Sequence, residues 1–211
     1  MIYAWASTDT KGIQYHGDNH NHIFIDFSKA DGIPATAFGE EESGKMSRLL
    51  VKNSLFGVLS TFQTQAAGSP SVYNIPYGSV ADFADDTNGC PLILLSNLER
   101  SVINFQSSPL VSLAINSVAN STFEFTHPEL FDVMTQPRTT LIGKLIPVPP
   151  EELDAAKSLY LDKHPKSKAW INFSDFTMYR MTIEDIYVVG GFGNDHYIGW
   201  LSSAQYLSVA L

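Results

Sequence analysis

Short apolar segments separated by turn residues are the feature that most limits how this chain can fold. Five runs of strand length, rich in Val, Ile, Leu, Phe, Tyr and Thr, occupy residues 56–62, 92–95, 110–115, 140–145 and 178–183. Such residues favour strands, and segments with helical periodicity lie before or between these runs. The order predicts a mainly β (α+β) fold, a β-barrel with peripheral helices in which the five segments are neighbouring strands.

Further elements follow from periodicity and from turn residues. Helices are predicted at 44–53, 97–107 and from Pro150 to before Pro165, and strands at 71–80, 138–148 and 176–189, with an acidic loop at 82–89. Residues 1–43 form an N-terminal arm with one strand-like run at 22–27, and residues 44–211 form the barrel domain. The apolar run predicts that the arm packs on the barrel or on a partner subunit.

Composition excludes several classes of function. The chain has 211 residues and a formal net charge of -9, which repels phosphate backbones and argues against nucleic-acid binding. No apolar stretch approaches the length of a membrane-spanning helix. The single cysteine, Cys90, is interpreted as a small buried hydrophobe. Two glycosylation sequons begin at Asn120 and Asn172.

The junction at residues 96–101 is the candidate anion site. Ser96, Asn97, Arg100 and Ser101 lie where a predicted strand passes into a predicted helix. Backbone N–H groups at a helix N-terminus attract anions, and an arginine adds bidentate hydrogen bonds. The alternative is a helix cap beside a solvated arginine.

Histidines offer two further candidates. His16, His20 and His22, with Asp18, have metal-ligand chemistry, but in a Gly/Asn-rich arm we expect no physiological metal site. His196 follows the glycine run 190–193, where it is either a turn residue or an axial haem ligand.

The ordered motifs resemble those of the CREG-like family. The similar segments are Met46–Val51 with Phe56–Thr61, Pro91–Ser96, Leu98–Gln106, Ser108–Leu113, Arg138–Leu145, Pro150–Leu153 with Ala156 and Lys157, and Lys163–Pro165 with Trp170. The resemblance covers about residues 44–205.

The resemblance implies a six-stranded antiparallel split β-barrel like that of pyridoxamine-phosphate oxidases, assembled as a homodimer. In that superfamily flavin mononucleotide (FMN) lies in a cleft at the dimer interface. Ser96, Arg100 and Ser101 would then contact the phosphate and Tyr77 would flank the ring, while Arg138 would add charge from the other subunit. Animal members are secreted or endolysosomal glycoproteins, so we expect a secretory compartment, with a signal peptide absent from this chain and a cytoplasmic location not excluded.

The sequence departs from the flavin-using pattern in two places. The lysine that follows the Ser101 position is missing, and the strand at 71–80 has no basic residue. Each missing charge-assisted bond costs about 1.5–3 kcal/mol of phosphate affinity. We therefore expect weak or no FMN binding and a colourless purified protein.

Three functions remain open. The first is a CREG-like homodimer that acts as a binding or regulatory glycoprotein. The second is an FMN-dependent oxidoreductase of the pyridoxamine-phosphate-oxidase-like superfamily. The third is a haem-binding protein, because the turn at 190–193 resembles that of the HugZ-like split barrels. Absorbance separates the three, since flavin absorbs near ~450 nm and haem shows a Soret band.

Overall fold

The computed structural model describes residues 39–64, 74–116, 134, 136–191 and 196–211, together with the backbone of two short strands in the arm. The strands are β1 (Gln14–Gly17), β2 (Ile23–Asp26), β3 (Phe56–Gln63), β4 (Ile75–Asp85), β5 (Pro91–Ser96), β6 (Leu110–Asn116), β7 (Arg138–Pro147), β8 (Phe176–Val189) and β9 (Ile198–Ser202). The helices are α2 (Glu40–Asn53), α3 (Arg100–Ser107), α5 (Leu153–Lys163), the 3-10 helix η4 (Pro165–Ala169) and α6 (Ser203–Leu207).

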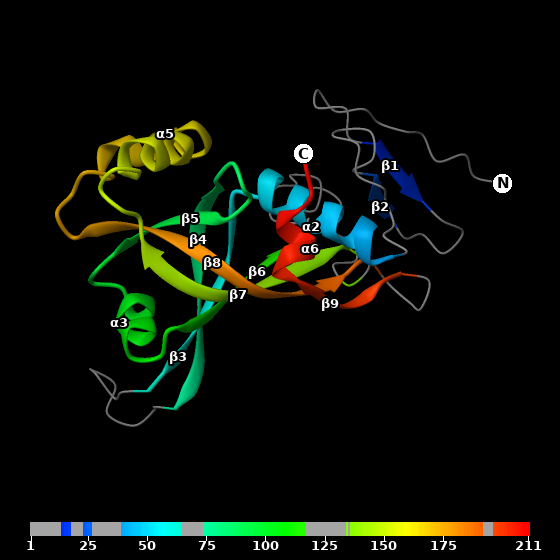
Figure 1. Ribbon diagram of the computed structural model, residues 1–211, viewed down its shortest axis with the longest axis horizontal. Helices are drawn as coiled ribbons and strands as arrows, with labels where there is room; N and C mark the ends of the chain where they lie inside the picture. Colours follow the sequence, from blue (N-terminus) through cyan, green and yellow to red (C-terminus); the bar gives the residue numbers. More distant parts are fainter. Residues whose placement is uncertain are drawn as a thin grey trace.

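Six antiparallel strands close into a barrel (Figure 1). Their order is β5-β4-β3-β6-β7-β8, and pairing of β5 with β8 completes the circle. The long strand β8 pairs with β7 along one edge. Its other edge is shared, because residues 176–180 pair with β5 and residues 185–189 pair with the extra strand β9. The predicted mainly β, six-stranded antiparallel barrel is confirmed, and all five expected segments lie in it.

Alternating burial shows which faces of the strands form the core. Along β3 the odd-numbered residues Gly57, Leu59, Thr61 and Gln63 are buried and the even-numbered ones are at least partly exposed. Strand β5 is buried throughout because both of its faces are covered. One face contributes to the barrel core, and the other packs in a second apolar cluster that includes Tyr160 of α5. Helices α2 and α6 pack against the barrel core (Figure 1).

A largely buried lysine fixes α5 to the barrel. The Nζ of Lys163 donates to the carbonyl oxygen of Val51, lies 3.4 Å from an Asp85 carboxylate oxygen and sits 4.9 Å from the ring centroid of Phe83. Burial lowers the pKa of Lys163, and the Asp85 carboxylate opposes that shift. The next residue, His164, hydrogen-bonds through Nε2 to the carbonyl oxygen of Phe83. These contacts hold the end of α5 against β4 and α2.

Several predicted element boundaries needed correction. Helix α3 begins at Arg100 rather than at residue 97, and α5 begins at Leu153 rather than at Pro150. Strand β4 runs to Asp85, through part of the expected acidic loop, because Ala81, Phe83 and Ala84 are buried. Asp82 occupies an exposed position on this strand, so its charge is compatible with pairing. Helix α2 begins at Glu40 rather than after Ser43, since acidic residues in a first turn interact favourably with the helix dipole.

The arm contributes a two-stranded antiparallel sheet, β1 with β2, of which the sequence predicted only the second strand. Packing of the arm on the barrel or on a partner subunit stays a prediction, as does the boundary between arm and barrel domain at residue 43. The sequon at Asn120 lies outside the described residues, whereas Asn172 is exposed and accepts a hydrogen bond from Lys157. Within the described part of the chain, no helix has the length and hydropathy needed to cross a membrane.

Candidate ligand-binding groove

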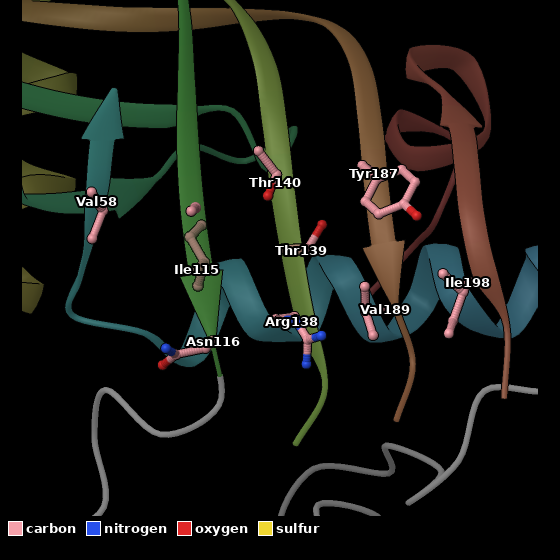
Figure 2. Close-up of a pocket in the computed structure, with 10 residues that line it drawn as sticks. Val58, Ile115, Asn116, Arg138, Thr139, Thr140, Tyr187, Val189 and Ile198 are labelled. Carbon is pink, nitrogen blue, oxygen red and sulfur yellow. The ribbon is translucent and has the colours of Figure 1, made fainter. Parts of the chain in front are cut away.

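A groove opens on the outer surface of the barrel, where β3, β6, β7, β8 and β9 lie side by side (Figure 2). Its volume is about 460 Å³, and ten residues line it: Val58, Ala114, Ile115, Asn116, Arg138, Thr139, Thr140, Tyr187, Val189 and Ile198. Five of these residues are aliphatic, and the other five, Asn116, Arg138, Thr139, Thr140 and Tyr187, carry polar groups. The groove therefore combines apolar surface with several polar groups, as sites for small organic ligands do.

Two adjacent rows of paired residues build the groove. In the first row Val58 pairs with Ala114, Ala114 with Thr140, and Thr140 with Tyr187. The second row runs from Asn116 through Arg138 and Val189 to Ile198. Figure 2 shows Thr140 above Arg138 on β7 and Tyr187 above Val189 on β8. Cross-strand pairing thus places residues from five strands on one face.

Arg138 supplies the positive charge of the groove. Its guanidinium Nη1 donates to the carbonyl oxygens of Met134 and Gln136, at 3.3 and 3.5 Å. No ion pair recorded among the described residues involves Arg138. Carbonyl oxygens orient a guanidinium without neutralising its charge, so the side chain remains suited to a carboxylate or a phosphate.

Apolar side chains continue the first row beyond the groove on both sides. Val80 of β4 pairs with Val58 and is 65% exposed, and Trp200 of β9 pairs with Tyr187 and is 58% exposed. The rings of Tyr187 and Trp200 pack edge to face with centroids 5.0 Å apart. Contiguous exposed apolar surface of this kind marks a binding face.

The predicted anion site lies away from the groove, at the junction of β5 and α3. Four of the six predicted residues lie together there. Ser96 ends β5, Asn97 lies in the turn, and Arg100 and Ser101 begin α3. Tyr77 lies half-buried on β4, opposite Thr61, whose hydroxyl accepts a hydrogen bond from Asn104 of α3.

Two carboxylates occupy this junction. Glu99 accepts hydrogen bonds from the Ser96 backbone N–H at 3.1 Å and the Ser101 hydroxyl at 3.3 Å. The Ser96 hydroxyl donates to the Asp175 carboxylate at 2.7 Å. A phosphate placed here would meet like charge and donors that are already engaged. The assignment of these residues to a cofactor stays a prediction, and the local charge disfavours it.

Arg138 is remote from that junction in the same subunit. Ser96 pairs with Phe176 at the start of β8, and Arg138 pairs with Val189 at its end. The two ends of this 14-residue strand are roughly 40 Å apart along an extended chain. One molecule therefore cannot use Arg138 together with Arg100 on a single small ligand.

Cys90 and His196 are weaker candidates for a functional site than the groove. Burial, with a smaller contribution from Asp86, raises the pKa of the Cys90 thiol to about 11, so the thiol stays protonated near neutral pH. His196 lies in the β8–β9 connection, and its ring packs closely against Gly191. No cluster of metal-ligating side chains occurs among the residues whose positions the structure gives.

Sequence reasoning identified Arg138 but missed Asn116, Tyr187, Val189 and Ile198. The signal that was available is alternation along the predicted strand 176–189, which puts Tyr187 and Val189 on one face. Their meeting with Arg138 depends on the register between β7 and β8, which shifts between Ile142 and Gly143. A single sequence does not reveal such a shift.

Comparison with known proteins gives consistent results. The model of the family described as "CREG, beta-barrel" matches residues 39–208. A relative from Arabidopsis thaliana, "Non-canonical heme oxygenase HOZ, chloroplastic", is 32% identical over 191 residues, covering 88% of this chain and 51% of that protein. Human "Protein CREG1" is 27% identical over 174 residues, covering 80% of this chain and 76% of that protein. The chain thus spans about half the length of the plant relative.

A solved structure shows the same fold. The haem-binding protein from Mycobacterium smegmatis superposes with a TM-score of 0.64 at 22% identity, covering 81% of this chain and 60% of that chain.

Proposed function

Because the chain belongs to the CREG β-barrel family, we propose that it is a haem-binding domain whose ligand lies in the outer groove between β3 and β9. The observation that carries the proposal is the groove itself, in which aliphatic side chains from four strands lie beside Arg138 and Asn116. Haem is a flat apolar macrocycle with two carboxylates on one edge. The residues present fit both parts of that ligand.

The groove residues would contact different parts of the haem. Val58, Ala114, Val189 and Ile198 would contact the faces and apolar edges of the macrocycle, where burial of apolar area supplies most of the affinity. Arg138 would hold a propionate through charge-assisted hydrogen bonds. When bound, haem supplies iron redox and oxygen-binding chemistry. The plant relative is described as a haem oxygenase and the mycobacterial protein as haem-binding, which supports this choice of ligand.

Flavin at the junction of β5 and α3 is the second candidate. Arg100 and Ser101 at the start of α3 favour it, and the carboxylates of Glu99 and Asp175 count against it. The compartment also stays a prediction. The plant relative is described as chloroplastic, whereas the resemblance to animal members implied the secretory pathway.

Haemin titration of two arginine variants distinguishes the groove from the β5–α3 junction. Titration with haemin, followed by the Soret band and by calorimetry, should show binding that Arg138→Gln weakens by roughly 10- to 150-fold, the equivalent of one charge-assisted bond of about 1.5–3 kcal/mol. The matched substitution Arg100→Gln should change the affinity less than about twofold. A parallel titration with FMN should give weak or no binding.

The reverse pattern would contradict the proposal. Haemin or FMN binding that needs Arg100 and ignores Arg138 would place the ligand at the β5–α3 junction. Wild-type protein that binds FMN with submicromolar affinity would favour the oxidoreductase.

We further propose that a second copy of the chain covers the groove. The face is open, and Val80, Val58, Ile198 and Trp200 are each at least 42% exposed on it. A patch of this kind is stabilised by association with another surface, and the family resemblance implied a homodimer.

Charged substitutions on the exposed face test whether two copies associate through it. The double substitution Val58→Asp, Val80→Asp places two carboxylates on the exposed face without changing the core, so the protein should sediment as a monomer in analytical ultracentrifugation while wild type sediments as a dimer. Leu211→Asp, at an apolar residue 47% exposed at the C-terminus, is the control and should leave the dimer intact. Monomeric wild-type protein at micromolar concentration would contradict the proposal.

A further inference from the structure

One residue in the groove has a side chain that coordinates haem iron in known proteins. The axial ligands that proteins provide are His, Cys, Met and Tyr. Among the ten lining residues there is no His, Cys or Met, and Tyr187 is the single Tyr. The guanidinium of Arg138 has no acceptor atom, and the other polar lining residues are Asn and Thr.

Packing holds the Tyr187 side chain on the groove side of the sheet. The residue lies near the end of β8, between Thr140 of β7 and Trp200 of β9, and it pairs with both. Its ring meets the Trp200 ring at an interplanar angle of 65°. A ring packed in this way loses little further freedom when its hydroxyl binds a ligand.

Tyr187 also lies at a useful position relative to Arg138. Arg138 is two residues before Thr140 on β7, so it is the diagonal neighbour of Tyr187 on the same face, with about 7–8 Å between such residues. The groove therefore presents an oxygen ligand for the iron and a cation for the carboxylate edge of the same macrocycle. Figure 2 shows the phenol and the guanidinium in adjacent rows.

We infer that Tyr187 is the axial ligand of ferric haem in this protein, an inference that rests on the proposed haem site. The phenol O–H bond breaks and its proton passes to water. The oxygen lone pair then forms an Fe–O bond in place of a bound water, and the iron stays ferric throughout. No oxidant or reductant is required.

His196 is a competing candidate among the described residues. It lies seven residues after Val189 in sequence but does not line the groove, and its ring packs against Gly191 instead. A His196→Ala variant therefore serves as the control for axial ligation.

The experiment compares haemin with iron-free protoporphyrin IX on wild-type, Tyr187→Phe and His196→Ala full-length protein. Phenylalanine keeps the ring and its contact with Trp200 but removes the ligating oxygen. Tyr187→Phe should weaken haemin binding by at least roughly tenfold and abolish the phenolate-to-iron charge-transfer absorption and the Fe–phenolate bands in resonance Raman spectra. Protoporphyrin IX binding should change less than about twofold in the same variant.

Three results would contradict the haem site or the axial ligand separately. If wild-type protein binds neither porphyrin, the proposed function and the axial ligand are both wrong. If both porphyrins bind and the ferric spectrum of Tyr187→Phe equals that of wild type, the groove stands and the axial role of Tyr187 is overturned. A spectrum lost in His196→Ala but retained in Tyr187→Phe would overturn it in favour of histidine.

Discussion

Replacement of Gly143 by alanine is expected to destabilise the protein by about 3 kcal/mol or more, which lowers the melting temperature by roughly 6–12 °C for a domain of this size. Gly143 lies on β7 at the register shift opposite β8. A Cβ atom at this position would overlap the carbonyl oxygen of Thr182 and press on the Cα of Ile183. These are backbone atoms of the paired strand, so the overlap cannot be relieved by rotating a side chain.

Gly44 provides a control with the same substitution and the opposite expected sign. It lies within α2, where a Cβ would make an ordinary 3.4 Å contact with Val209. Glycine within a helix costs about 1 kcal/mol relative to alanine, so Gly44→Ala should be neutral or stabilising by up to that amount. Thermal unfolding of the two variants beside wild type measures both effects. If Gly143→Ala melts with wild type, the close approach of β7 and β8 is not a feature of the protein in solution.

The strands were predictable where burial on one face repeats with a period of two. The expected bounds of β8, 176–189, equal those observed, because β-branched, aromatic and other apolar residues recur along the whole segment and a glycine run follows it in the sequence. Prediction was wrong at β4, where Asp82 and Asp85 suggested a loop. A charged residue on the outer face of a strand remains solvated, so Asp82 does not prevent strand pairing. The amino-acid sequence alone does not reveal that Phe83, which lies between the two aspartates, is fully buried.

Residues of the candidate sites were harder to predict, for a reason that lies in pairing. Arg100 and Ser101 were correctly placed with Ser96 because they are neighbours in sequence. Asp175, which changes the charge of that junction, is 79 residues from Ser96 and reaches it only through the β5–β8 pairing. The groove residues also depend on long-range strand pairing. Arg138 lies beside Tyr187 only because the irregularity at Gly143 sets the register between β7 and β8. Local pattern fixes which face a residue occupies, and tertiary pairing decides its neighbours.

An ion-pair cluster around Arg180 gives the second large expected effect. The Arg180 Nε lies 3.0 Å from the Asp86 carboxylate, and its Nη1 lies 2.7 Å from that of Glu152. These contacts join β8 to the β4–β5 turn and to the segment that precedes α5. The Arg180 and Asp86 side chains are 28% and 9% exposed, so solvent screens the pair incompletely.

Arg180→Met should cost about 2–3 kcal/mol in the free energy of unfolding. Removing one partner of a buried pair costs 3–5 kcal/mol. The smaller figure here reflects the partial exposure of Arg180 and two backbone hydrogen bonds, from Asn88 and Cys90, that Asp86 would keep. Urea denaturation at neutral pH measures the change. Lys144→Met is the control, because its 2.7 Å pair with Glu184 is nearly half exposed on both sides and should contribute less than about 0.5 kcal/mol.

Adding Asp86→Asn to Arg180→Met tests whether the cost arises from an uncompensated carboxylate. Asparagine keeps an oxygen that accepts the hydrogen bonds from Asn88 and Cys90 but carries no charge. The double variant should therefore recover about 1 kcal/mol relative to Arg180→Met, and the two substitutions should be non-additive by at least that much in a double-mutant cycle. Additive losses would show instead that Arg180 stabilises the barrel through its apolar stem or through Glu152 alone. In that case the Asp86 carboxylate is adequately solvated by the turn that it caps.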